Sequence, residues 1–165
     1  MSGPKAKAVR SVLVTGGSRG LGLAIAQKLA TAGYRTIAVA RSENKDVTAA
    51  IVQAERADAG ALHFVPFNLG KIDEIPVLVR SLRKEFGPLF GLVNNAALGV
   101  DGALAMMHNA KIEEMVRVNT LSPIVLTKYI VRSMMADGAG RIVNVASIIG
   151  FTGYSGLAAY AATKA

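Results

Sequence analysis

Short apolar runs alternate with amphipathic stretches along most of the chain. Apolar residues recur at every third or fourth position over residues 21–32, 46–59, 73–86 and 109–137, which predicts helices, and most of these stretches end near a glycine. The apolar runs are rich in Val, Ile, Leu and Phe, and they cover residues 12–15, 36–40, 62–67, 89–94 and 141–146. Their length and composition are typical of buried strands. Five strands that alternate with four helices require parallel pairing through right-handed crossovers. The pattern therefore predicts an α/β fold, a Rossmann-type doubly wound parallel sheet that binds ligands at the carboxyl ends of its strands.

Composition agrees with one globular domain. The 165 residues are 52% hydrophobic and 18% charged, which is too apolar for a disordered chain. We expect a flexible N-terminus over residues 1–10, without the pattern of a secretory signal, and one domain over residues 11–165. Because no apolar run approaches the roughly 18 residues of a membrane span, we expect no membrane contact and a cytoplasmic location. With no cysteine and two histidines, the chain offers no thiolate and a poor set of metal ligands.

The charge is strongly positive. Lys and Arg number 19 against 11 Asp and Glu, so the net charge is +8, which suits nucleic acid, an anionic membrane or a phosphorylated ligand. Apart from the N-terminus and one short cluster at residues 80–84, the basic residues are scattered and have no aromatic residues between them. This distribution argues against nucleic-acid binding.

A glycine-rich turn follows the first predicted strand. Gly16 allows a tight exit from the strand, Gly20 allows close approach of a pyrophosphate, and Gly22 allows the next helix to pack on the strand. The helix N-terminus adds free amides and a favourable dipole. This context favours a dinucleotide site over a purely structural turn, although the spacing Gly-x-x-x-Gly-x-Gly departs from the commoner Gly-x-Gly-x-x-Gly.

Two arginines point to the form of the dinucleotide. An NAD site usually has an acidic residue at the end of the second strand, whereas this chain has Arg41. Arg41 and Arg19 can together pair with the 2′-phosphate of NADP. The alternative is that Arg41 is a solvated loop charge. The pair of arginines favours NADP(H) over NAD(H).

An ordered set of polar residues follows in the second half of the chain. It consists of Asn94-Asn95-Ala96-Ala97 at the end of the fourth strand, Asn119 in the fourth helix, Ser147 after the fifth strand, and Tyr160-x-x-x-Lys164. With the turn at residues 15–22, this set resembles the short-chain dehydrogenase/reductase family over residues 12–164. Within that family the chain is most similar to the 3-oxoacyl-[acyl-carrier-protein] reductases, through residues 18–22, 67–69, 101–104 and 140–144.

The chemistry of three residues agrees with this resemblance. On a helix, Tyr160 and Lys164 share a face, and a nearby ammonium favours the phenolate, which suits a proton donor to a carbonyl. Ser147 can hydrogen-bond the same oxygen as negative charge develops there. The resemblance implies that Lys164 also binds the nicotinamide ribose, that Tyr160 touches the cofactor, and that further cofactor contacts come from Ser18, Leu21, Asn68, Leu69, Asn95, Ala96 and Ala97.

Asn119 lies four residues before Pro123. Because proline has no N–H, the Asn119 carbonyl loses its helical partner and becomes available to water. The resemblance implies that Asn119 holds a water that links Lys164 to solvent in a proton relay, so that the catalytic set is Asn119, Ser147, Tyr160 and Lys164. The alternative is a simple kink satisfied by a water.

Several features depart from the family pattern. Ala97 stands where the family has glycine, and residues 136–138 lack the basic side chains with which acyl-carrier-protein reductases often meet their acidic partner. The chain ends one residue after Lys164, without the further strands and substrate lid of the family. We therefore expect the 165-residue polypeptide alone to have little reductase activity. The alternative reading is a noncatalytic nucleotide-binding module or inactive fragment.

The resemblance also implies partners. The leading hypothesis is an NADP-dependent oxidoreductase that reduces a carbonyl, such as that of a small molecule or a 3-oxoacyl thioester, to an alcohol. An acyl carrier protein would then be a partner. The family assembles through the long fourth helix and the helix near Tyr160, which implies a homo-oligomer, a dimer or a tetramer.

Overall fold

The computed structural model describes residues 9–57 and 60–165. Two predicted segments lie partly outside this range. They are residues 1–8 of the predicted flexible N-terminus and the last two residues of the predicted helix 46–59. Five parallel strands form one sheet in the order β3-β2-β1-β4-β5, which confirms the doubly wound prediction. The strands are β1 (Ser11–Thr15), β2 (Arg35–Ala40), β3 (Ala61–Pro66), β4 (Leu89–Asn94) and β5 (Arg141–Asn144).

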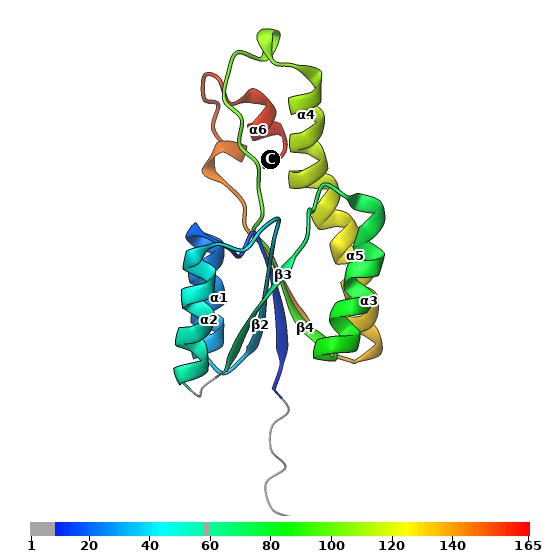
Figure 1. Cartoon of the computed structure of the whole chain (residues 1–165). Helices are drawn as coiled ribbons and strands as arrows, with labels where there is room; N and C mark the ends of the chain where they lie inside the picture. The colour runs from blue at the N-terminus through cyan, green and yellow to red at the C-terminus, as the bar shows by residue number, and fades with distance from the viewer. Residues whose placement is uncertain (1–8, 58–59) are drawn as a thin grey trace, which may run out of the picture.

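Helices cover both faces of the sheet, with α1 and α2 on one side and α3 and α5 on the other (Figure 1). The helices are α1 (Gly20–Thr31), α2 (Lys45–Ala57), α3 (Ile75–Phe86), α4 (Asn109–Val116), α5 (Ser122–Ala136) and α6 (Ala158–Ala162). The carboxyl ends of the strands point to one edge, beyond which α4 and α6 lie with the chain terminus (Figure 1). Among the described residues, no helix is both long and apolar enough to cross a membrane.

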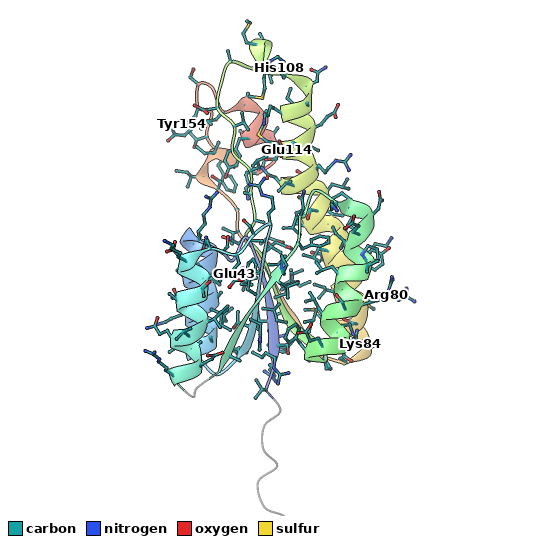
Figure 2. All side chains as sticks on the ribbon, viewed as in Figure 1. Glu43, Arg80, Lys84, His108, Glu114 and Tyr154 are labelled. Carbon is teal, nitrogen blue, oxygen red and sulfur yellow. The ribbon has the colours of Figure 1, made fainter. Side chains whose placement is uncertain are left out.

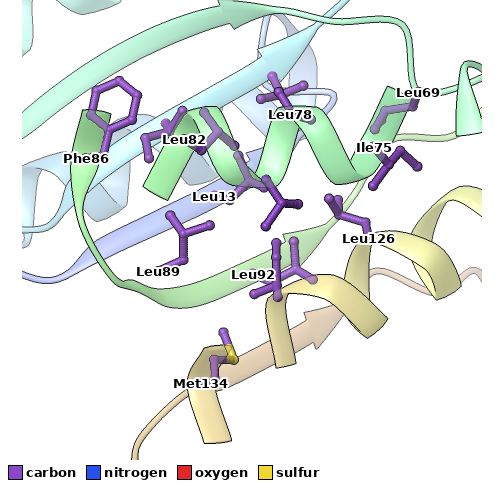
Figure 3. Close-up of a cluster of buried hydrophobic side chains, with 14 residues drawn as sticks. Leu13, Leu69, Ile75, Leu78, Leu82, Phe86, Leu89, Leu92, Leu126 and Met134 are labelled. Atoms are coloured by element: carbon purple, nitrogen blue, oxygen red, sulfur yellow. The ribbon is translucent and has the colours of Figure 1, made fainter. Parts of the chain in front are cut away.

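Two apolar cores hold the layers together. One lies between the sheet and helices α3 and α5 and includes Leu13, Leu82, Leu92 and Leu126 (Figure 3). The other lies between the sheet and helices α1 and α2, where Val14, Ala26 and Val47 are fully or almost fully buried. Strands β1, β2 and β4 are therefore covered on both faces, as their unbroken apolar sequences predict.

The predicted fourth helix, residues 109–137, is divided. A π-helical turn, η3 (Arg117–Leu121), separates α4 from α5. The Ser122 amide donates to the Arg117 carbonyl five residues earlier. Pro123, which follows directly, has no N–H for the ordinary bond to the Asn119 carbonyl, and this explains why the helix widens here.

The fifth strand differs from its prediction. It ends at Asn144 rather than at residue 146, and all four of its residues are exposed. The prediction of a buried strand does not hold for β5, because β5 is the edge strand of the sheet that the described residues form.

Candidate active site

The glycine-rich turn is built by close backbone contacts. Gly16 has a φ of 66°, in the left-handed region that glycine favours, and its amide donates to the Val39 carbonyl at 2.8 Å. A Cβ at Gly22 would collide with the Gly16 carbonyl and with the side-chain amide of Asn95. The structure therefore has the tight backbone geometry expected at Gly16 and Gly22. Gly20 also has a positive φ, of 54°, and a Cβ there would meet only open space, while contact of these glycines with a cofactor stays a prediction.

Thr15 joins this turn to the end of β4. Its hydroxyl accepts from the amides of Asn95 and Ala96, each at 3.0 Å, and Asn95 Nδ2 donates to the Thr15 carbonyl at 2.9 Å. These hydrogen bonds fix the carboxyl ends of β1 and β4 relative to each other. The sequence motif includes Thr15 but does not indicate this role.

A second contact with the turn comes from Asn44, a residue that the sequence motifs do not include. Asn44 Nδ2 donates to the Ser18 carbonyl at 3.0 Å, and Asn44 Oδ1 accepts from the Val47 amide at 3.0 Å. One side chain therefore caps the start of α2 and holds the glycine-rich turn. An asparagine just before a helix was the available signal.

A cavity of about 460 Å³ lies beside the turn at the carboxyl ends of the strands. Arg19 and Arg41 both line it and are exposed, and Glu114, which pairs with Lys111 at 3.6 Å, lines it as well. Figure 2 places Glu114 beyond the edge of the sheet. Twelve of the predicted cofactor-binding residues line this cavity: Gly16, Ser18, Arg19, Gly20, Leu21, Gly22, Arg41, Asn68, Leu69, Asn95, Ala96 and Ala97. Ala97 is exposed, so its methyl group is not packed into the core.

An adjoining cavity of about 440 Å³ shares Leu69, Ala96 and Val118 with the first. Asn119 and Lys164 line it, together with Asn94. The structure therefore brings two members of the predicted catalytic set to one cavity and the predicted nucleotide contacts to its neighbour.

Asn119 is buried and its side chain is fully engaged. Its Oδ1 accepts from the Leu98 amide at 2.7 Å, and its Nδ2 donates to the Leu98 carbonyl at 2.8 Å and to the Thr163 hydroxyl at 2.9 Å. These contacts join the chain after β4 to the end of α6. A role of the Asn119 carbonyl in holding water stays a prediction.

Lys164 lies just beyond α6, where the helical turn has tightened. The Lys164 ammonium donates to the Val145 carbonyl at 3.0 Å, and its burial lowers the pKa of that ammonium. Tyr160 is half-buried, and its ring lies about 4 Å from where a Cβ at Gly99 would stand. The predicted proximity of this ammonium to the Tyr160 hydroxyl stays a prediction.

Ser147 lies three residues beyond the last residue of β5. It is half-buried, and its hydroxyl accepts from the Ile149 amide at 3.3 Å. This contact closes a short turn at η4 (Ile148–Gly150). Because the Ser147 proton is not used in that bond, the hydroxyl remains able to donate.

This combination of fold and ordered residues defines a class of protein. The family model described as short chain dehydrogenase matches residues 10–165, and the chain belongs to that family.

Individual relatives have different names. The chain is 33% identical over 156 residues to the 3-oxoacyl-[acyl-carrier-protein] reductase FabG of Staphylococcus epidermidis, covering 94% of this chain and 64% of that protein. It is also 33% identical over 152 residues to the 2-dehydro-3-deoxy-D-gluconate 5-dehydrogenase of Formosa agariphila, covering 92% and 57%. Among solved structures, a metagenomic short-chain oxidoreductase in complex with NADP matches with a TM-score of 0.88 and 31% identity, covering 94% of this chain and 70% of that one. The chain spans between 54% and 64% of the length of the curated relatives it matches.

Proposed function

We propose that this chain forms the NADP(H)-binding and catalytic part of an oxidoreductase that reduces a carbonyl group to an alcohol. The observation that carries the proposal is the cavity beside the glycine-rich turn, where twelve residues expected to contact a dinucleotide come together from four separate segments of the chain. Membership of the short-chain dehydrogenase family supports it.

The cavity suits a phosphorylated ligand. Helix α1 has no acidic residue in its first turn, and its N-terminal amides lie beside the open space at Gly20. Arg19 and Arg41 add two positive charges at the cavity, and β2 is followed directly by Arg41 rather than by a carboxylate. This charge pattern favours NADP(H) over NAD(H), and the NADP bound to the metagenomic neighbour agrees with it.

We assign the chemistry of the protein to three side chains. Bound NADPH supplies a hydride for the carbonyl carbon. Tyr160 gives its phenolic proton to the carbonyl oxygen, and Ser147 donates a hydrogen bond to that oxygen as charge develops. Lys164 binds the nicotinamide ribose and favours proton transfer from Tyr160 through its positive charge.

A 3-oxoacyl thioester is the substrate that we favour, with an acyl carrier protein as its carrier and a cytoplasmic location. The similarity to a 3-oxoacyl-[acyl-carrier-protein] reductase supports this choice, while the similarity to a sugar-acid dehydrogenase makes the competing substrate class explicit. We further propose a homo-oligomer formed through α4 and α5. The exposed Val116, Leu121 and Ile124 on this segment support that assembly.

The decisive experiment follows NADPH absorbance with the longest polypeptide that contains this sequence. Acyl thioesters, diketones and sugars are compared, with NADH in parallel and the Tyr160→Phe variant as the blank. We expect turnover that prefers NADPH and a 3-oxoacyl thioester. Turnover confined to sugar acids would move the protein to the other substrate class. Nucleotide binding without turnover on any carbonyl would instead identify a noncatalytic binding module.

A further inference from the structure

Four residues are joined by a directional line of hydrogen bonds near the end of the chain. Leu98 is bonded through both its amide and its carbonyl to the side chain of Asn119, and this fixes which end of the Asn119 amide is oxygen. The second N–H of that amide is therefore directed to the Thr163 hydroxyl, 2.9 Å away. Thr163 in turn donates its single hydroxyl proton to the Tyr160 carbonyl at 2.7 Å.

The line reaches the segment that carries both proposed reacting side chains. Tyr160 belongs to α6, and Lys164 lies two residues after the last residue of that helix. Asn119 is buried in the π-helical turn η3 and therefore offers this segment a fixed point.

Thr163 connects Asn119 to the segment that carries Tyr160 and Lys164. It lies directly before Lys164 in sequence, and its hydroxyl contacts the Tyr160 backbone. Leu98, at the other end of the line, precedes Gly99, which lies beside the Tyr160 ring. Asn119 is thus bonded both to Leu98, whose neighbour Gly99 lies beside the Tyr160 ring, and to Thr163, whose hydroxyl contacts the Tyr160 carbonyl.

We propose that Thr163 is a positioning residue, which orients Tyr160 and Lys164 for reaction by tying their turn to Asn119. The inference rests on the proposed function, since it assigns a purpose to the geometry of those two residues. Thr163 takes no part in proton transfer, because its one proton is committed to the Tyr160 carbonyl.

The test compares Thr163→Val, which keeps the shape but removes both hydrogen bonds, with Thr163→Ser, which keeps the hydroxyl. The matched control is Thr31→Val, because Thr31 also donates to a carbonyl of its own helix, that of Gln27, but lies exposed on α1. We expect Thr163→Val to lower kcat about 10- to 100-fold with little change in the KM for NADPH, since misplaced reacting groups impair chemistry more than binding. Thr163→Ser and Thr31→Val should stay near wild type.

Amide hydrogen exchange gives a readout that does not need activity. The amides of residues 161–165 should exchange about tenfold faster in Thr163→Val than in wild type or Thr163→Ser, because the tie to Asn119 is lost. If Thr163→Val does not fold, Thr163→Ala makes the same comparison without a second methyl group. The inference would be overturned if a variant that lacks the hydroxyl kept the wild-type exchange rates and kcat. Equal losses in Thr163→Val and Thr163→Ser would overturn it as well. An inactive wild type would instead overturn the proposed function, and the exchange rates would still decide whether Thr163 holds the turn.

Discussion

Strands β1 and β5 flank β4 on either side, yet they lie in different environments. All five residues of β1 are buried, whereas all four residues of β5 are exposed. The glycine-rich turn follows β1, and Ser147, Tyr160 and Lys164 follow β5. Within the described residues, the proposed cofactor turn therefore follows a buried strand, and the proposed catalytic segment follows an exposed one.

The difference shows two ways of placing a functional group. The glycine-rich turn is fixed by the apolar core beneath it and by backbone contacts too close for a side chain, as at Gly22. The segment after β5 is fixed mainly by polar contacts from Asn119, Thr163 and Lys164. Changes at the turn should alter stability and nucleotide affinity together, whereas changes after β5 should alter the reaction and leave the core intact.

The largest effect is expected after β5. Tyr160→Phe removes only the transferable proton, so kcat should fall by about 10²- to 10⁴-fold, the usual contribution of a general acid. NADPH affinity and melting temperature should change little because the ring remains. Stopped-flow turnover and fluorescence titration measure the two quantities.

Tyr154→Phe is the matched control for this substitution. Tyr154 is exposed, lies six residues earlier, and projects beyond the edge of the sheet (Figure 2). Its hydroxyl should be dispensable. A Tyr160→Phe enzyme with a substantial share of wild-type kcat would remove Tyr160 from the role of proton donor.

At the glycine-rich turn the expected effect is on stability. A Cβ at Gly22 collides with the Gly16 carbonyl and with Asn95, so Gly22→Ala should lower the free energy of unfolding by about 1–3 kcal/mol and weaken NADPH binding. Gly153→Ala is the control from the other region, since a Cβ there meets nothing within 4 Å. Urea denaturation of both variants measures the difference. Equal stability of the two variants would contradict the collision expected at Gly22.

How far the sequence predicts the structure also differs between the two regions. Strand β4 has the predicted bounds, and the other central elements differ from prediction by one or two residues, because buried strands and amphipathic helices leave a strong periodic signal. The close contacts of Gly16 and Gly22 followed from their place between strand and helix. In contrast, β5 ends two residues before the predicted bound of its apolar run at residue 146, and it lies exposed at the edge of the described sheet.

The missed residues share one property. Thr15, Asn44 and Thr163 each form a side-chain hydrogen bond to a segment distant in sequence, and no spacing rule reveals such distant partners. The π-helical turn was partly foreseeable, since Pro123 predicted a lost bond at Asn119 but not the wider turn that replaces it.

The preference for NADPH over NADH should depend only on residues at the cavity beside the glycine-rich turn. Arg41→Asp replaces one of the two cavity arginines with the acid typical of NAD sites, so it should cost NADPH about 1.5–3 kcal/mol of binding free energy and leave NADH less affected. Arg56→Asp, on the exposed side of α2, is the control of equal charge change. Isothermal titration with both nucleotides provides the measurement. An unchanged preference in Arg41→Asp would assign Arg41 to solvent rather than to the 2′-phosphate.

The smallest effect concerns two titratable groups, His63 on β3 and Lys164 after β5. Burial, followed by the positive charge of Arg35, lowers the pKa of His63 on β3 below its ordinary value of 6.5, and Glu85 and Glu55 oppose the shift. Burial likewise lowers the pKa of Lys164 below 10.5. In both cases the unfolded chain binds the proton more tightly than the folded protein, so stability rises with pH within the window between the two pKa values.

The two windows have different upper bounds, 6.5 for His63 and 10.5 for Lys164. As the pH falls below 6.5, the unfolded chain takes up a proton on His63 that the folded protein resists, and stability declines. His63→Phe keeps a ring against Phe86, whose centroid is 4.9 Å away, and should flatten this decline in acid. Lys164→Met should leave the acid branch unchanged and remove only the gain that wild type shows as the pH approaches 10.5. Urea unfolding at a series of pH values separates the two, and an equally steep acid branch in His63→Phe would exclude His63 as its source. The change should be smaller than those above because His63 is only half-buried and solvent screens its charge.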